Sequence, residues 1–566
     1  MNLEYKNFKT LLVSRHTMSD SDSSSNGLDQ ECEQSKPNSK KRRFTTSQNI
    51  ISTKKLVNSR RAEDITMAIC KMIAIDMLPT LIVENEGFIQ FMAISAPGYK
   101  VPSRRTIDNR MRTLYNEAAE QVRTTLDKVD AVAITTDAWT SKANDSYITL
   151  SAHYLDDNWI PHTVNLMTRE MTESHTAEHL QKTIREVVQE WNLTNKVTGL
   201  VHDNASNIVK AAKELGDTDG MLSVRCAAHT IQLSVNTALE APECVSVIKK
   251  GAEIVSAFRH SYSRTTALED KLKSLGLPTL RLMQRCPTRW DSTFFMLDRL
   301  QTLRSGIMAA LSDRSVFKSA IAAKLELCEA EWVKVMQLTV LLKPFQQATT
   351  ILCAEKSITL SIVRLIIYNL INRHLLVKDD DSSLQRTFKV RAALDLTDRF
   401  KMKNINVNNE VTAMQMATLL DPRHKKLIAE PSESVRSFIH TEVQRRTNLN
   451  HRHLATPNGN EQRQGSTVMD FLLGMDENHE GDDFAKYVAE TQIDHNLDLC
   501  AWWKAHEVCF PAVAKIARQL LCIPASSATA ERVFYTAGNI VSAKRSCLLP
   551  ENVSHLIFLH QNRSLI

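Results

Sequence analysis

The chain has 566 residues, of which 43% are hydrophobic and 24% are charged, and its formal net charge is +6. This length exceeds what one hydrophobic core organises, so we expect two to four domains. Its eleven cysteines are scattered without a C-x-x-C pair, its N-terminus has no apolar signal segment, and no apolar run approaches the roughly 18 residues of a membrane span. The composition therefore argues against a disulfide scaffold, a zinc ribbon, a secreted protein and a membrane protein.

Residues 17–48 are rich in Ser, Asn, Lys and Asp, and we expect residues 1–48 to be a disordered, basic and Ser-rich tail. Nine lysines and arginines but no Asp or Glu lie between positions 36 and 61. Such a block is typical of a nuclear-import signal or a nucleic-acid contact, and a solvated tail is the plain alternative. We predict nuclear localisation, with the import signal at Lys40, Lys41, Arg42 and Arg43.

Residues 49–125 are expected to form a small, helical and basic domain. Apolar residues at helical spacing occur from position 65 to 73, and Pro79 closes this pattern. Ser103 is a candidate N-cap for a further helix, which carries Arg104 and Arg105. We expect this domain to contact DNA.

The segment 126–299 changes to an order of strands and helices. Three β-leaning runs come first, at 131–136, 146–155 and 159–168. A helix, a strand, a second helix and a strand that turns helical follow, at 180–188, 197–203, 207 onward and 222–235. This α/β order matches the RNase H-like core, in which the first and fourth strands lie side by side.

The remaining chain is read as two parts. From 300 to 495 the pattern is helical apart from two polar breaks, which predicts an all-α domain. From 496 to 566 the sequence is again apolar and structured, and we expect it to pack on the earlier core.

Two aspartates follow apolar strands. Asp137 and Asp203 each stand at the C-terminal end of such a run, so neighbouring strands would bring both carboxylates to one edge of the sheet. Two close carboxylates repel unless a cation lies between them, and their hard oxygens suit Mg²⁺ or Mn²⁺. Such ions support phosphodiester chemistry when a third carboxylate completes the site. The plain alternative is that each Asp caps the turn or helix that follows it.

Five ordered motifs resemble those of the hAT family of transposases and the zinc-finger-BED proteins descended from it. They are TTDAWTSKANDSYITLSAHY, VHDNASN, RCAAHTIQL, CPTRWDST and the closing LLCIPASSATAERVF with AGNIVSAKRSCLLPENVSHLIFL. The resemblance runs from about residue 62 to 563 and implies an α/β RNase H-like core interrupted by a large all-α insertion domain and preceded by a small helical domain.

The resemblance also assigns the site. It implies that Asp137, Asp203 and Glu531 are the catalytic carboxylates and the ligands of Mg²⁺ or Mn²⁺. Cys226 and His229 match the family's C-x-x-H motif near the active site, where they would lie close to DNA. A buried cysteine beside a hydrogen-bonded histidine is the alternative for this pair.

Two further regions match family features. Arg289 and Trp290 match an R-W pair whose tryptophan stacks on a flipped base, a contact worth roughly 1–3 kcal/mol; alternatively, Trp290 anchors the inserted domain. The C-terminal region, 496–566, would end the RNase H-like core and form the dimerisation region of a homodimer or larger assembly, although all its apolar side chains can instead pack within one chain. The candidates for the dimer contact are Trp502, Trp503, Phe510, Phe534, Leu556 and Leu559.

The sequence departs from the family at its N-terminus. A BED zinc finger needs two cysteines and a histidine pair, but only Cys32 and Cys70 precede Cys226. We therefore expect no zinc finger and leave DNA contact to residues 36–125. The sequence predicts a nuclear transposase-derived protein that binds DNA and dimerises, with Mg²⁺-dependent cleavage and strand transfer as its candidate activity. A catalytically inactive transcription or chromatin regulator and a protein scaffold without DNA affinity are the alternatives.

Overall fold

The computed structural model describes residues 57–140, 146–286, 289–402, 412–425, 433–454, 483–540 and 550–566. The tail predicted over residues 1–48 lies outside this part of the chain, and so do the import-signal residues Lys40, Lys41, Arg42 and Arg43.

The described chain opens with helices: α2 (Ser59–Asp76), η1 (Thr80–Glu84), α3 (Glu86–Ser95) and α4 (Arg104–Asp127). Ser103 is the N-cap of α4, as predicted, and accepts a hydrogen bond from the Thr106 N–H. Of the helical domain predicted over 49–125, the structure describes residues from 57 on. The buried faces of α2 and α4 belong to one hydrophobic core with the sheet and the last helix, α23 (Pro550–Gln561).

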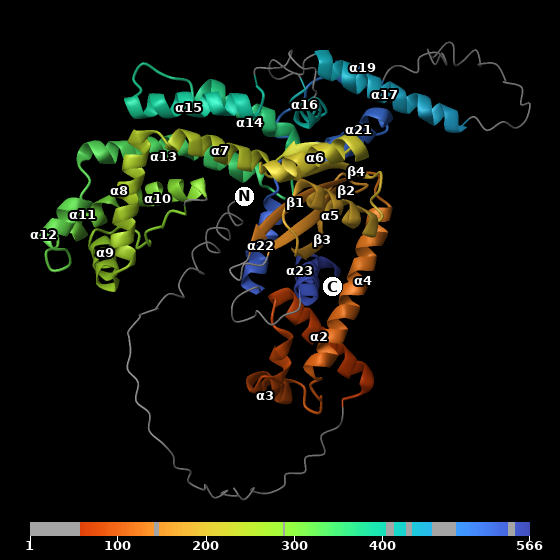
Figure 1. Cartoon of the computed structure of the whole chain (residues 1–566), viewed down its shortest axis with the longest axis horizontal. Helices are drawn as coiled ribbons and strands as arrows, with labels where there is room; N and C mark the ends of the chain where they lie inside the picture. The colour runs from red at the N-terminus through yellow and green to blue at the C-terminus, as the bar shows by residue number, and fades with distance from the viewer. Residues whose placement is uncertain are drawn as a thin grey trace, which may run out of the picture. The chain divides into compact units, whose positions relative to one another are not determined.

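A five-stranded mixed sheet stands at the centre of the α/β part (Figure 1). Its spatial order is β3-β2-β1-β4-β5, with β1 antiparallel to β2 and parallel to β4. The predicted neighbourhood of the first and fourth strands is therefore confirmed. The strands are β1 (Val132–Thr140), β2 (Ser146–Leu155), β3 (Pro161–Met171), β4 (Val197–His202) and β5 (Leu222–Arg225).

Each face of the sheet is covered by a different set of helices. Ile134 and Leu200 belong to the core that contains α5 (Ala177–Glu190), α6 (Ser206–Asp219) and α23. Ala133 and Val201, the neighbouring residues on the same strands, point to the opposite face and a second core. That core contains α16 (Ala413–Leu419), α17 (Glu433–Leu454), α19 (Asp483–Ala489), α20 (Leu499–His506) and α21 (Pro511–Leu521).

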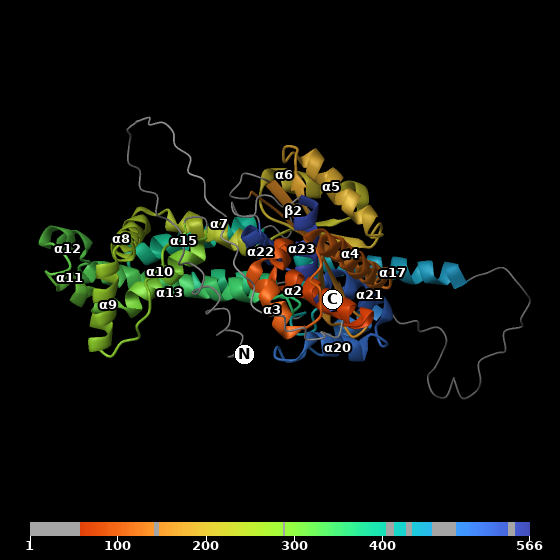
Figure 2. The ribbon, with the colours of Figure 1, turned by 90° about the horizontal axis from the view of Figure 1, so that it is seen from below.

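A third core holds the helical domain together. It runs from Ala227 to Leu396 and includes Ala525, so this domain begins just after β5 rather than at residue 300, and α16, α17 and α19 pack against the sheet instead of belonging to it. Figures 1 and 2 both show the domain extending away from the sheet. Its helices are α7 (Ala227–Leu239), α8 (Pro242–Arg259), α9 (Tyr262–Ser274), α10 (Trp290–Thr302), α11 (Arg304–Ser312), α12 (Ser319–Leu325), α13 (Glu329–Leu352), α14 (Val363–Asn369) and α15 (Ser383–Arg399).

Among the described helices, none combines the length and apolar character that a membrane crossing requires.

Candidate active site

The parallel pairing of β1 with β4 brings the two predicted aspartates to the same level. Thr135 pairs with Val201, and Asp137 and Asp203 each follow two residues later. Because alternate strand residues share a face and adjacent strands lie about 4.8 Å apart, the two carboxylates are neighbours. Asp137 was predicted to end its strand, but β1 continues to Thr140 by pairing with β2.

Both aspartates also make local hydrogen bonds. The Asp137 carboxylate accepts the N–H of Ala138 at 2.9 Å, and the Asp203 carboxylate accepts the N–H of Ala205 at 3.0 Å. Asp137 lies inside β1 and caps no helix, and Asp203 binds the N–H of Ala205, the N-cap residue of α6, so only Asp203 has a role near that of the capping alternative. These hydrogen bonds leave the remaining carboxylate oxygens available for other partners.

Glu531 reaches this region from the far end of the sequence. It lies in the first turn of α22 (Ala528–Ile540), which packs on β1 and β2, and its side chain is exposed. Phe534 of the same helix lies 5.6 Å, between ring centroids, from Trp139 of β1. The helix therefore brings a third carboxylate to the end of the sheet where Asp137 stands.

The three carboxylates share one electrostatic environment. Burial, together with the negative charges of Glu531 and Asp203, raises the pKa of Asp137 to about 8, against one lowering hydrogen bond from Ala138. Like charges disfavour ionisation in this way only when they lie near one another. In the protein without a bound cation, Asp137 is therefore largely protonated at neutral pH.

The fit of this site to a divalent cation can be judged from its charge and its geometry. A cation would relieve the repulsion that raises the Asp137 pKa, and carboxylate oxygens are the ligands that Mg²⁺ and Mn²⁺ prefer. In the part of the chain that the structure describes, however, no group of three or more His, Cys, Asp and Glu side chains is placed to hold a metal ion. The negative charges of the three carboxylates suit a divalent cation, but the side chains would have to move closer together to bind it.

Cys226 connects the elements that carry the second and third carboxylates. Its N–H donates to the carbonyl of His202, the residue before Asp203, at 2.7 Å. Its buried thiol sulfur accepts the N–H of Ser527 at 3.4 Å and that of His229 at 3.4 Å. Cys226 is buried, as in the alternative for this pair, and His229 is partly exposed and bonds to the thiol through its backbone N–H.

The serines before α22 were not predicted from the sequence. The Ser526 hydroxyl accepts the N–H of Ala528 at 3.0 Å and the thiol of Cys226 at 3.5 Å. Ser527 stands at the start of the helix and accepts the Glu531 N–H through its carbonyl at 3.3 Å. A serine pair directly before a helix that carries an early Glu is an N-terminal signal that could have identified them.

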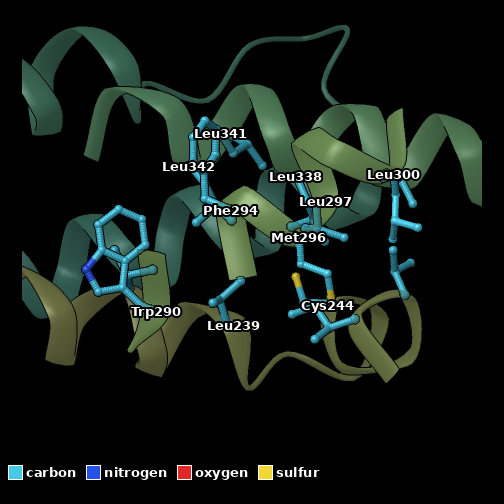
Figure 3. Packing of buried hydrophobic residues seen from close by; sticks show 14 of the residues in the cluster. Leu239, Cys244, Trp290, Phe294, Met296, Leu297, Leu300, Leu338, Leu341 and Leu342 are labelled. Atoms are coloured by element: carbon cyan, nitrogen blue, oxygen red, sulfur yellow. The ribbon is translucent and has the colours of Figure 1, made fainter. Parts of the chain in front are cut away.

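The expected base-stacking role of Trp290 is not supported. Trp290 is 3% exposed and packs edge-on against Phe345, with ring centroids 6.4 Å apart. Figure 3 shows it among the apolar side chains of the helical core. Its indole faces are covered because α10 begins at Trp290 and turns it inward, which corresponds to the anchoring alternative. Its neighbour Arg289 is exposed.

The side chains expected at the dimer contact pack within the protomer. Trp503 stacks between Trp159 and Tyr487, at 5.2 and 5.5 Å between ring centroids, and Trp502 meets Trp503 edge-on. Phe510 belongs to the same core, Leu556 and Leu559 are buried in the core of α2 and α4, and Phe534 faces Trp139. The other five side chains are buried, so a partner could reach them only if the protomer opened, whereas Phe534 is partly exposed.

The basic residues of α4 differ in how much of their charge is free. Arg110 pairs with Glu63 at 2.8 Å and Arg112 lies 3.7 Å from Glu551. Arg104 lies 3.9 Å from Asp108, whereas Arg105 is exposed. The first turn of α4 therefore presents the more available positive charge.

Comparison with known families agrees with this layout. The hAT family C-terminal dimerisation region matches residues 483–563, the ZBED1 RNase-like domain matches residues 135–225, and the ZBED1 RNase-like helical domain matches residues 224–340. Asp137 and Asp203 lie in the second of these and Glu531 in the first. The helical match begins at the same point of the chain as the helical core. No N-terminal BED finger is detected.

Several known proteins are similar along most of the chain. "Putative AC transposase" of Zea mays is 27% identical over 85% of this chain. "Zinc finger BED domain-containing protein 4" of Homo sapiens is 23% identical over 89%, and "Putative transcriptional regulator tpeD" of Talaromyces stipitatus is 24% identical over 85%. The chain spans 62%, 44% and 60% of the lengths of these three relatives.

Proposed function

Because this chain belongs to the hAT family of transposases and transposase-derived zinc finger BED proteins, we propose that it is a nuclear, DNA-binding dimer that cleaves phosphodiester bonds. The presence of the hAT dimerisation region supports a transposase-derived protein that dimerises. Cleavage, DNA binding and nuclear localisation are the proposed parts.

One observation supports cleavage above the others. β1, β4 and the first turn of α22 come from distant parts of the sequence, yet Glu531 and Asp203 both act on the pKa of Asp137. Folding a protein so that three carboxylates repel one another costs stability, and groups with strongly shifted pKa values gather at functional sites. A structural role for the same three acids would not require them to meet.

The chemistry is the exchange of phosphodiester bonds. An attacking oxygen, from water or from a DNA 3′-hydroxyl, forms a bond to phosphorus while the bond to the leaving oxygen breaks, and the proton of the attacking group passes to solvent. A divalent cation held by Asp137, Asp203 and Glu531 would activate the attacking oxygen and stabilise the leaving one. Strand transfer exchanges one phosphodiester for another and therefore needs no ATP.

The residues of the chain itself prepare this reaction. Burial and neighbouring charge keep Asp137 largely protonated until a cation arrives, so the site accepts the cation with release of a proton. The hydrogen bonds of Cys226 tie the residue before Asp203 to the start of α22. We assign DNA contact to Arg104, Arg105 and Arg289, and to His229, which follows Cys226 in the first turn of α7.

A nicking assay with Mn²⁺ tests cleavage. Its substrate is duplex DNA that ends in the terminal inverted repeats of the transposable element from which the gene derives. We expect Asp137→Asn, Asp203→Asn and Glu531→Gln each to reduce the rate by about 100-fold or more. Asp130→Asn is the matched control, because Asp130 is exposed just before the opposite end of β1. A rate that Asp137→Asn leaves unchanged would exclude these acids as the catalytic group.

A catalytically inactive chromatin or transcription regulator is the second candidate. The lack of a ready three-ligand metal group among the described residues favours it, and one similar protein carries the name of a putative transcriptional regulator. This candidate predicts that the triple acid variant occupies chromatin as the unaltered chain does and that neither protein nicks DNA. Nicking by the unaltered chain would contradict it.

Nuclear localisation is proposed from the sequence block at Lys40, Lys41, Arg42 and Arg43. Replacing all four with alanine should move a fluorescent fusion out of the nucleus. Replacing the separate pair Lys54 and Lys55 with alanine is the control. If only the control variant leaves the nucleus, the import signal does not lie at residues 40–43.

A further inference from the structure

Arg532 directly follows Glu531 on α22, and its side chain binds the end of α13. One guanidinium nitrogen donates to the carbonyl oxygen of Cys353 at 2.8 Å, and another pairs with the carboxylate of Glu355. Cys353 is the C-cap of α13, so its carbonyl lies at the negative end of the helix dipole, where a cation is favoured. We call these two bonds the Arg532 bridge.

The same part of the helical domain also contacts the chain just before α22. The Cys353 sulfur and the Ser526 hydroxyl oxygen lie 3.4 Å apart. The Ala525 N–H donates to the hydroxyl of Thr359, seven residues after the end of α13, at 3.0 Å. The segment that follows α13 is therefore bonded to the chain on both sides of Glu531, and the Arg532 bridge lies on the helix itself.

The Arg532 bridge is open to solvent. The side chains of Arg532 and Glu355 are 41% and 44% exposed, and ion pairs this exposed add little to the stability of a fold. Its geometry is more restrictive than its energy, because a planar guanidinium that binds two acceptors at once has a fixed direction. The bridge therefore restrains the orientation of α22 more than it stabilises the protein.

Glu531 depends on that orientation, because its own side chain is exposed and is not held by packing. Consecutive residues of a helix project about 100° apart around its axis, so a fixed direction for Arg532 also fixes the direction of Glu531. Among the described residues, the acids are not yet spaced to hold a metal ion. A small rotation of α22 would therefore change how readily they close on one.

We propose that Arg532 is a positioning residue, whose bonds to Cys353 and Glu355 orient Glu531 for cation binding and so join the helical domain to the acids. The inference rests on the proposed cation site, and its rate measurement rests on the proposed cleavage as well. Groups that hold metal ligands in place typically contribute roughly 10- to 100-fold to metal affinity.

Calorimetric titration of the full chain with Mn²⁺ alone tests the proposal. We expect Arg532→Ala to weaken Mn²⁺ binding about tenfold or more, with a melting temperature within about 3 °C of the unaltered protein. Glu355→Ala keeps the Cys353 bond and should weaken binding about threefold. The double variant should bind no more weakly than Arg532→Ala, because Glu355 acts through Arg532.

Lys271→Ala is the matched control. Lys271 pairs with Asp313 at 3.0 Å inside the helical domain, and the two side chains are 36% and 27% exposed. Its loss removes an ion pair of similar exposure without touching the Arg532 bridge. This variant should bind Mn²⁺ within about twofold of the unaltered protein.

Steady-state nicking separates positioning from a direct contact of Arg532 with DNA. At saturating Mn²⁺, the loss of a positioning residue lowers kcat and leaves the KM for DNA unchanged. A higher KM for DNA together with unchanged Mn²⁺ affinity in Arg532→Ala would make Arg532 a DNA contact, and it overturns the inference.

The outcomes also separate this inference from the proposed function. A chain that binds no Mn²⁺, or that binds it equally well as Asp137→Asn, overturns both. A chain that binds Mn²⁺ but cuts no DNA overturns cleavage alone, and the calorimetric comparison then decides the inference. Unchanged Mn²⁺ affinity in Arg532→Ala, or losses that multiply in the double variant, overturn the positioning role alone. If Arg532→Ala does not fold, unchanged affinity in Glu355→Ala overturns it.

Discussion

The thiol sulfur of Cys226 accepts a hydrogen bond from the backbone N–H of Ser527, 3.4 Å away, across 301 residues of sequence. Cys226 is the N-cap of α7 and Ser527 precedes α22, so this contact joins the start of the helical domain to the helix that carries Glu531.

Cys226→Ala should destabilise the protein and impair cleavage. It leaves the buried Ser527 N–H without its acceptor, at a cost of about 1–3 kcal/mol, and frees the start of α22 to move. Urea denaturation measures the first effect and DNA nicking the second. Cys244→Ala is the control, because Cys244 is also a buried free cysteine but lies in the helical core. Equal losses in both variants would mean that volume, and not the hydrogen bond, is responsible.

Binding of Mn²⁺ should strengthen as pH rises towards 8. With a pKa of about 8, the Asp137 carboxyl is protonated below that value, and each bound cation must displace the proton. The apparent dissociation constant should fall about tenfold per pH unit from 6.5 to 8 and level off above. Calorimetric titration across this range checks it. An affinity that does not vary with pH would show that Asp137 is not a ligand.

Trp290→Ala should lower the free energy of unfolding of the helical domain by about 3–5 kcal/mol. The indole is buried against Phe345 and its neighbours, and its removal leaves a cavity. Tyr262→Ala is the control in the same domain, because Tyr262 is 88% exposed. A Trp290→Ala protein of normal stability with weakened DNA binding would restore the base-stacking role.

Acid should destabilise the sheet through His153. This buried residue lies between the hydroxyls of Thr135 and Thr163, at 2.9 and 3.0 Å, and burial lowers its pKa from 6.5 to about 3. Between these values the unfolded chain binds a proton that the folded chain does not, so stability is present above pH 6.5 and falls as pH decreases. The loss is at most about 1.4 kcal/mol per pH unit.

His153→Gln should reduce that dependence when denaturation is followed from pH 7 to 4. His260→Gln, at an exposed position, should leave the dependence as it is. If the two variants behave alike, acid sensitivity arises at other groups.

The sequence by itself predicted that Asp137 and Asp203 lie at one edge of the sheet. Alternation of apolar residues located β2 at its observed bounds, and the adjacency of the first and fourth strands made Asp137 and Asp203 neighbours, since strand pairing follows from local pattern and a small set of allowed topologies. The ordered motifs added Glu531. Periodicity also identified the helices, because each buries one face.

Only the tertiary structure decided which side chains are covered and by what. Trp290 and Trp503 belong to motifs that suggested DNA and partner contacts, and both are buried because helices from elsewhere in the chain pack over them. The same physics left Phe91 and Ile94 exposed on an apolar helix and joined Cys226 to Ser527. A sequence records the chemistry of each side chain, whereas burial is a property of all the elements that pack around it.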